Sequence, residues 1–160
     1  LERATGMAFR ARSLENIYNY LAVDEFLTTS GQPDAGELAL IAAANYKTVI
    51  NLAPQSVLEN SLKSEAQLVS ELGLQYVHIP VDFKQPTKAD FEQFVAAMNQ
   101  CDDDKVWVHC AANMRVSAFI YCYRVLHCGE AEEQAAARLA SIWTPFGVWR
   151  KFVASLAFHR

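Results

Sequence analysis

Four short segments of the chain have the composition of β-strands. They span residues 26–30, 48–52, 75–81 and 105–110, and each is rich in β-branched or aromatic residues and bounded by turn-forming residues. Between them, apolar residues recur at the spacing of an amphipathic helix. Strands that alternate with helices favour right-handed crossover connections. The pattern therefore predicts an α/β domain with a central, mostly parallel sheet of about four to five strands, flanked by helices.

The same periodicity places three helices between the strands. The first is expected to have Pro33 in its first turn and to end near Asn45, and the third to end near Cys101. The second is expected to stop at Gly73, which suits the left-handed conformation after a helix. The inward positions are predicted to be Leu38 and Ile41 in the first helix, and Leu58, Leu62, Val69 and Leu72 in the second.

From residue 116 onward the apolar spacing is helical throughout. It predicts a helical C-terminal third of three helices, the last of which has Thr144 as its cap and Pro145 as its first residue. Neither a linker nor a repeat interrupts the pattern. We therefore expect residues 1–160 to form a single domain, with residues 1–12 as a flexible N-terminal extension.

Composition narrows the classes of partner. The chain has 160 residues, 52% of them hydrophobic and 20% charged, with a net charge of −4. Lys and Arg are scattered, which argues against a nucleic-acid partner, and no apolar run approaches the roughly 20 residues of a membrane span.

The cysteines and the start of the chain set further expectations. Four cysteines are too few for a disulfide scaffold and match no paired zinc pattern, so we expect reduced thiols and neither metal nor cofactor. The chain starts at Leu1 without a signal sequence. We expect a cytoplasmic protein, or a periplasmic one if an upstream signal was removed.

The stretch VHCAANMRVS carries the candidate chemistry. It places Cys110 at the end of a predicted strand and Arg115 at the start of a predicted helix. In an open α/β sheet, ligands bind beyond the carboxyl ends of the strands, where helix N-termini present free amides to anions. Arg115 is expected to close the ring of donors around the anion. The positive charge of Arg115 and the helix N-terminus also favour the nucleophilic thiolate of Cys110. The backbone predicted to wrap the oxyanion consists of Ala111, Ala112, Asn113, Met114 and Arg115.

From about Ser13 onward, the chain resembles the cysteine-dependent protein tyrosine and dual-specificity phosphatase superfamily. It is most similar to a bacterial branch of phosphatase-like proteins known by a domain of unknown function. The resemblance rests on SGQP, TVINLA, LGLQYVHIPVD, PTKADFEQF and VHCAANMRVSAF, in that order. It implies that Cys110 forms a phosphocysteine and that the loop and Arg115 bind phosphate. It also implies that His109 orients the loop through hydrogen bonds and that Ser117 helps the thiolate to depart.

The loop is one residue shorter than the superfamily pattern. That pattern has five residues between cysteine and arginine, followed directly by Ser or Thr. Here four residues separate Cys110 from Arg115, and Val116 lies between Arg115 and Ser117. The branch that the chain most resembles has the same short spacing. Anion binding is therefore the firmer prediction, because ester hydrolysis also requires a correctly placed arginine.

Two aspartates compete for the role of general acid. Such an acid protonates the leaving oxygen and contributes about 10² to 10⁴ in rate. Asp90 lies in TKAD, which has the pattern of a capping box with Thr87 as N-cap. Asp82 follows the predicted strand 75–81 and matches the superfamily's acid loop by position. We choose Asp82.

The preferred interpretation is a phosphoric monoester hydrolase acting on a phosphorylated protein or small molecule. Cys110 would attack phosphorus, Asp82 would protonate the leaving group, and water would hydrolyse the phosphocysteine. Two alternatives stay open. The short loop is also similar to that of rhodanese-like sulfurtransferases, and a non-catalytic phosphate- or phosphoprotein-binding module would need Arg115 and the amides without a working acid.

Overall fold

The protein is built around one five-stranded sheet. The computed structural model describes residues 13–59 and 61–158, and the predicted extension 1–12 lies outside them. The strand order is β1-β2-β5-β3-β4, with β1 antiparallel to β2 and all other neighbours parallel. The strands are β1 (Leu21–Ala22), β2 (Leu27–Ser30), β3 (Tyr46–Asn51), β4 (Gln75–His78) and β5 (Lys105–His109). The predicted α/β class and mostly parallel sheet are confirmed.

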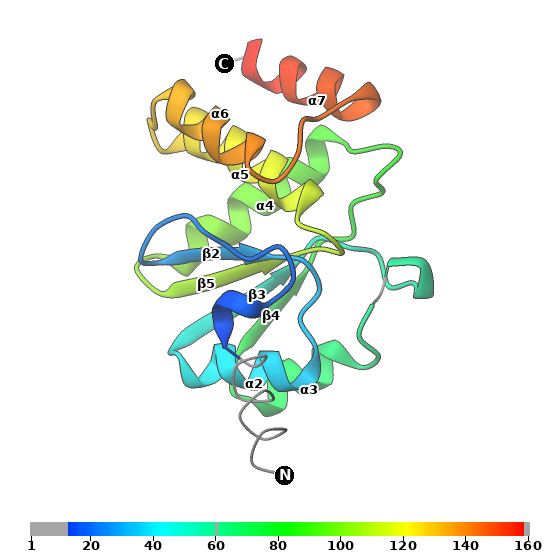
Figure 1. Ribbon diagram of the computed structural model, residues 1–160, viewed down its shortest axis with the longest axis vertical. Coiled ribbons are helices and arrows are strands. Elements are labelled where there is room, and N and C mark those ends of the chain that lie inside the picture. The colour runs from blue at the N-terminus through cyan, green and yellow to red at the C-terminus, as the bar shows by residue number, and fades with distance from the viewer. Residues whose placement is uncertain (1–12, 60, 159–160) are drawn as a thin grey trace.

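Helices cover both faces of the sheet (Figure 1). On one face lie η1 (Leu14–Asn16), α2 (Ala35–Ala43) and α3 (Glu65–Glu71), and η2 (Val57–Glu59) lies in the connection from β3 to α3. On the other lie α4 (Lys88–Cys101), α5 (Met114–His127), α6 (Glu132–Ala140) and α7 (Gly147–Phe158). The helical C-terminal third is therefore confirmed, and it forms one side of the molecule.

Two apolar cores result from this arrangement. The larger one lies between the sheet and α4, α5 and α7, and includes Phe94, Phe119 and Trp149. The smaller one lies on the opposite face and includes Ile41 and Trp107. Each fully buried side chain of this size stabilises the fold by about 1.5–3 kcal/mol relative to leaving it exposed. Because β5 is the middle strand of the sheet, its side chains enter both cores, and its carboxyl end is fixed from both sides.

Several predicted helix features are confirmed. Leu38 and Ile41 are fully buried on α2. Gly73 follows α3 with a φ of +82°, which is the left-handed conformation expected there. Thr87 and Asp90 form the capping box of α4, with both reciprocal hydrogen bonds present.

The second predicted helix was wrong in its first half. Leu58 and Leu62 do not belong to α3, which begins only at Glu65, and the side chain of Leu58 is 98% exposed. The reason is local hydrogen bonding, since Ser61 Oγ accepts from the amide of Ser56 and donates to the carbonyl of Pro54. Ser side chains that bond to nearby backbone in this way favour loops over helix.

Two proline assignments were also wrong. Pro33 precedes the helix, because Asp34 is the N-cap of α2 and forms a capping box with Glu37. Pro145 lies two residues before the first residue of α7, Gly147. In both cases the helix begins one or two residues later than predicted, after a conformation that proline helps to fix. Among the described residues, no helix combines the length and apolar character needed to cross a bilayer.

Candidate active site

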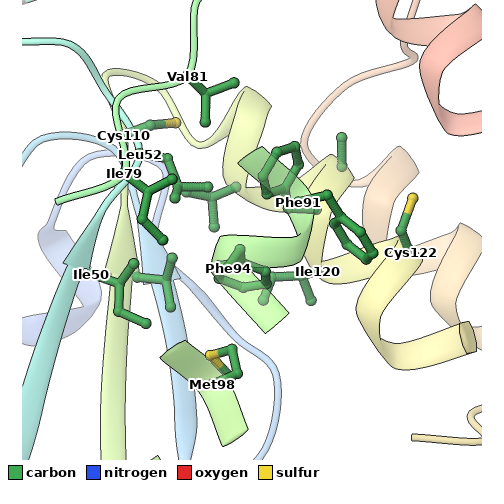
Figure 2. Close-up of a cluster of buried hydrophobic side chains, with 14 of the residues drawn as sticks. Ile50, Leu52, Ile79, Val81, Phe91, Phe94, Met98, Cys110, Ile120 and Cys122 are labelled. Atoms are coloured by element: carbon green, nitrogen blue, oxygen red, sulfur yellow. The ribbon is translucent and has the colours of Figure 1, made fainter. Parts of the chain in front are cut away.

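Cys110 lies at the carboxyl end of the central strand. It follows β5 directly, and only three residues separate it from the first residue of α5. Its side chain is fully buried, and Figure 2 shows it at one end of the larger core, near Val81. Asn113, the N-cap of α5, has a φ of +66°, a left-handed conformation that asparagine tolerates. The chain therefore turns sharply from strand to helix around the thiol.

The carbonyl groups of the loop are bonded to the surrounding scaffold. The carbonyl of Ala111 accepts from the amide of Gln32 at 3.0 Å, and that of Ala112 accepts from Asn19 Nδ2 at 2.9 Å. The carbonyl of Cys110 lies 3.3 Å from His109 Nδ1. In a trans peptide the N–H group points away from the C=O group. The amides that follow these carbonyls are thus turned to the opposite side, as an oxyanion-binding loop requires.

Gly31 allows the loop at Ala111 to lie close to Tyr18 and the end of β2. A Cβ atom at Gly31 would lie 2.6 Å from the carbonyl oxygen of Ala111 and 2.6 Å from a ring carbon of Tyr18. Both distances are too short for any side chain, so only glycine fits between the loop and Tyr18. The SGQP motif therefore acts directly on the loop, since its glycine makes room and Gln32 supplies a hydrogen bond.

Asn113 ties the loop to the N-terminal segment. Its side chain is fully buried, and Nδ2 donates to the carbonyl of Asn19 at 2.9 Å and to Thr29 Oγ1 at 3.0 Å. Asn113 is therefore bonded through its side chain, and this bonding supports its left-handed backbone.

Arg115 is buried beside the thiol and paired with a carboxylate. Its two terminal nitrogens donate to Glu59, Nη1 to Oε2 at 3.0 Å and Nη2 to Oε1 at 2.5 Å. Nη1 also donates to the carbonyl of Val81 at 3.0 Å, and Phe83 packs against the guanidinium. Its Nε is buried and has no hydrogen-bond partner among the described residues. The arginine thus keeps one unused donor close to the loop.

Charge around Arg115 keeps the guanidinium protonated. Burial alone would lower the pKa of Arg115, but the carboxylate of Glu59 and the thiol of Cys110 together raise it above its ordinary value. Both neighbours act on the same side chain, which indicates that the structure brings Cys110 and Arg115 together. Val116, where the superfamily pattern has arginine, is fully buried in the larger core.

A buried polar network lies beneath the loop. His109 Nε2 lies 2.7 Å from Glu65 Oε2, and both side chains are almost completely buried. The other carboxylate oxygen of Glu65 accepts from Gln32 Nε2 at 2.6 Å. Burial works to raise the pKa of Glu65, but hydrogen bonds from His109, Gln32 and Tyr76 and the charge of His109 lower it below its ordinary value. Glu65 is therefore an ionised carboxylate inside the protein.

Asp82 lies in the loop that follows β4, next to the residues that contact Arg115. Val81 and Phe83, its two neighbours in the chain, contribute the carbonyl and the ring described above. Its side chain is exposed, and Oδ1 accepts from the amide of Lys84 at 2.9 Å. Asp90, the competing aspartate, is engaged in the capping box of α4. Asp82 thus remains the better candidate for the acid.

Ser117 is hydrogen-bonded on both sides of its hydroxyl. Its hydroxyl donates to the carbonyl of Met114 at 3.1 Å and accepts from Trp143 Nε1 at 3.1 Å. A hydroxyl has one hydrogen to donate, and here that hydrogen is used within α5. The geometry shows Ser117 in contact with Trp143, and its predicted assistance to a leaving sulfur stays a prediction.

An open hollow of ≈ 500 Å³ adjoins the loop at Ala111. Tyr18 and Lys63 lie on its wall, together with Gln32. This hollow gives the molecule space for a ligand beside the loop.

Sequence reasoning missed two acidic residues, Glu59 and Glu65. Each contacts the site from a segment far away in the chain, 56 and 44 residues from its partner. No local spacing reveals such a pairing. The sequence signal is limited to their place in the chain, because both acids follow β3, which neighbours β5 in the sheet.

Comparisons with known proteins bear on the family and the fold of the chain. Residues 12–148 match the family model described as "DSP-PTPase phosphatase fused to NAD+ Kinase". The chain is 31% identical to a solved structure from Shewanella putrefaciens CN-32, described as "Putative phosphatase (DUF442)". That match covers 91% of this chain and 95% of the other, with a TM-score of 0.80.

Two further matches extend the comparison. The solved structure of Tk-PTP in its active form has a TM-score of 0.75 at 15% identity over 89% of this chain and 98% of the other, which shows a shared fold. A beta-lactamase hydrolase-like protein of Xylella fastidiosa, strain Temecula1, is 32% identical over 95 residues. These cover 58% of this chain, and the chain spans only 22% of the length of that relative.

Proposed function

Because the chain belongs to the family of DSP-PTPase phosphatases fused to NAD+ kinase, we propose that it hydrolyses phosphomonoesters through a phosphocysteine on Cys110. The fold is that of the protein tyrosine and dual-specificity phosphatases. The observation that carries the proposal is the placement of a fully buried thiol at the carboxyl end of β5, within reach of the charged side chain of Arg115.

In the first step, the Cys110 thiolate attacks phosphorus and the bond to the ester oxygen breaks. Asp82 gives its proton to that oxygen, so the product leaves as a neutral alcohol. The amides of residues 111–115 and Arg115 hold the other phosphate oxygens, which carry negative charge throughout. The helix dipole of α5 adds to this stabilisation, since the loop leads directly into the helix N-terminus.

In the second step, water attacks the phosphocysteine. Asp82, now a carboxylate, takes a proton from that water, and the sulfur–phosphorus bond breaks. Inorganic phosphate leaves, and Cys110 returns to the thiolate. The electron pairs and protons balance over the two steps without a metal, and Asp82 ends in its initial protonated state.

Substrate binding has to compete with Glu59. The carboxylate of Glu59 already takes both terminal nitrogens of Arg115, as two oxygens of a phosphate would. A phosphate group that approaches Cys110 either displaces this carboxylate or bonds to the free Nε. We infer that the arrangement keeps the arginine extended and charged until an anionic substrate arrives.

The test is direct. Purified protein is given an aryl phosphate, a phosphotyrosine peptide, a phosphoserine peptide and NADP+, the last because the family description pairs the phosphatase with NAD+ kinase. Release of phosphate is measured for wild type, Cys110→Ser, Arg115→Lys and Asp82→Asn. We expect Cys110→Ser to abolish turnover and Asp82→Asn to lower it by about 10² to 10⁴.

Three outcomes would reject the proposal. Phosphate release that is unchanged in Cys110→Ser would show that the thiol is not the nucleophile. Sulfur transfer from thiosulfate to cyanide, without phosphate release, would favour a sulfurtransferase. Binding of phosphate or vanadate that requires Arg115, with no turnover of any ester, would leave a phosphate-binding module.

A further inference from the structure

We propose that Val57 and Leu58 of η2 form a recognition surface for the apolar side chains beside the phosphorylated residue of a protein or peptide substrate. The inference rests on the proposed function and deepens it, since it names the class of substrate that the Cys110 site accepts. It starts from two aliphatic side chains that the fold leaves uncovered, next to the residue that pairs with Arg115.

These two side chains are almost completely exposed. Val57 is 94% exposed and Leu58 is 98% exposed, and none of the residues of η2 is buried. A single exposed aliphatic side chain is common on protein surfaces. Two adjacent ones at this level of exposure, beside the candidate active site, indicate a surface that a partner covers when it binds.

The geometry of η2 explains the exposure but not the apolar character. A 3-10 helix has three residues per turn, so its three successive side chains point in three different directions. Glu59 is directed at Arg115, with Oε2 3.0 Å from Nη1, and the other two side chains of the turn therefore point away from the site. Polar residues are the usual occupants of such positions. Valine and leucine gain free energy there only when another apolar group covers them.

The turn is held in shape by hydrogen bonds of its own loop. The amide of Leu58 donates to Ser56 Oγ at 3.1 Å, and the amide of Glu59 donates to the carbonyl of Ser56 at 3.1 Å. A surface that is already ordered loses little conformational entropy when a ligand covers it. In Figure 1 this turn, drawn in teal, projects from the body of the molecule, so a ligand can reach both aliphatic side chains.

The position of η2 in the chain identifies the ligand. Glu59 directly follows Leu58, and its carboxylate occupies the nitrogens of Arg115 that a phosphate would take. A phosphorylated residue that replaces this carboxylate is therefore brought next to η2. Consecutive residues of any chain are about 3.8 Å apart, so the neighbours of the phosphorylated residue lie on the same scale as Val57 and Leu58 do from Glu59.

The same loop borders the space for the rest of a peptide. Ser61, Leu62 and Lys63 follow η2 and line the hollow of ≈ 500 Å³ that adjoins Ala111. A chain that extends from the cysteine loop into this hollow runs along the loop that carries η2. This continuity favours a peptide over a small phosphate ester, which needs only the cysteine loop.

The test compares two phosphopeptides that differ only beside the phosphorylated residue. One has leucine on both sides and the other has serine, and each pair is made with phosphotyrosine and with phosphoserine. The value of kcat/KM is measured for the wild type, for the double variant Val57→Ser with Leu58→Ser, and for Val148→Ser. The last is the matched control, because Val148 is an aliphatic residue of α7 that is 43% exposed.

Contact between aliphatic groups discriminates substrates by about tenfold or more. We expect the wild type to prefer the leucine peptide by about tenfold, and the double variant to hydrolyse the two peptides with equal kcat/KM. Val148→Ser is expected to keep the preference of the wild type. A preference that survives in the double variant, or a wild type without a preference, overturns the proposal.

A second copy of the chain is the other apolar partner that could cover η2. Sedimentation of the wild type and of the double variant separates the two cases. We expect both proteins to have the same oligomeric state. A wild-type dimer that the double variant converts to a monomer would assign Val57 and Leu58 to a subunit interface and overturn the proposal.

A binding measurement distinguishes failure of the inference from failure of the proposed function. Cys110→Ser, with and without the double change in η2, is titrated with the same peptides by calorimetry. Tighter binding of the leucine peptide that is lost with Val57 and Leu58 supports the inference, even if the wild type hydrolyses no ester and the phosphatase is rejected. Hydrolysis of esters with equal affinity for the two peptides, or with no peptide binding, supports the phosphatase and rejects the role of η2.

Discussion

Replacing Glu59 by glutamine removes the negative charge beside Arg115 and keeps the size of the side chain. The side chains of Arg115 and Glu59 are 4% and 23% exposed, so the pair is largely but not completely buried. Removing one partner of a buried pair costs about 3–5 kcal/mol, whereas an exposed pair is worth about 0.2–1 kcal/mol. For this intermediate case we expect Glu59→Gln to lower the free energy of unfolding by about 1–3 kcal/mol.

An added anion should largely restore this loss. Phosphate at about 100 times its Kd stabilises a folded protein by about 2.7 kcal/mol. In the variant, phosphate binds to Arg115 without competition from Glu59, so the variant should gain more from phosphate than the wild type does. The difference in stability between the two proteins is therefore expected to shrink as phosphate or vanadate is added, and the KM for an aryl phosphate is expected to fall.

The measurement is urea unfolding of wild type and Glu59→Gln, with and without phosphate, at constant ionic strength. Glu92→Gln is the control, because Glu92 pairs with Lys88 on the surface and is 65% exposed. It should change the free energy of unfolding by less than about 0.5 kcal/mol and should not respond to phosphate. If phosphate stabilises the wild type and Glu59→Gln equally, Glu59 and phosphate do not share Arg115, and the reasoning is refuted.

Three further predictions concern other parts of the site and fold. Gly31→Ala places a methyl group 2.6 Å from the carbonyl of Ala111, so we expect a loss of about 1–3 kcal/mol in urea unfolding and a loss of phosphate binding by calorimetry. The folded-state pKa of Glu65 lies below its unfolded value, so its ionised form stabilises the protein near neutral pH and this contribution disappears as pH falls through the folded pKa, below about 4.5. Urea unfolding of Glu65→Gln should accordingly show a weaker loss of stability in acid than the wild type. The side chain of Leu58 is 98% exposed and that of Leu38 is fully buried. Leu58→Ser should therefore change the free energy of unfolding by less than about 0.5 kcal/mol, while Leu38→Ala should lower it by about 2–5 kcal/mol. Equal losses of the two variants in thermal unfolding would contradict this placement.

The sequence predicts the sheet well because central parallel strands are buried on both faces. Val106, Trp107 and Val108 form a continuous apolar run, and each is buried in β5. β1 was missed because its two residues are too few to show any periodicity. The false first half of the second helix arose because Leu58 and Leu62 lie at helical spacing, while the serine hydrogen bonds that shape the loop have no periodicity.

The candidate site was predictable only in part, because local spacing in the sequence reveals only residues that are close in the chain. Cys110 and Arg115 are close in the chain, so their spacing after a strand and before a helix indicates an anion loop. The partners of that loop, such as Glu59 and Glu65, come from distant segments and are brought in by the fold. Asp82 was placed by resemblance, and its role as acid stays a prediction that the hydrolysis assay tests.

The anchored carbonyls of the loop bear on whether its length can be changed. Gln32 and Asn19 hold the carbonyls of Ala111 and Ala112, and Asn113 is bonded at the next position. An inserted residue would have no room within this span unless one anchor were released. The length of the loop therefore depends on the segments before α2 as well as on the loop itself. If the loop alone were transplanted onto a phosphatase that has five residues between cysteine and arginine, it would lose the residues that give it its shape.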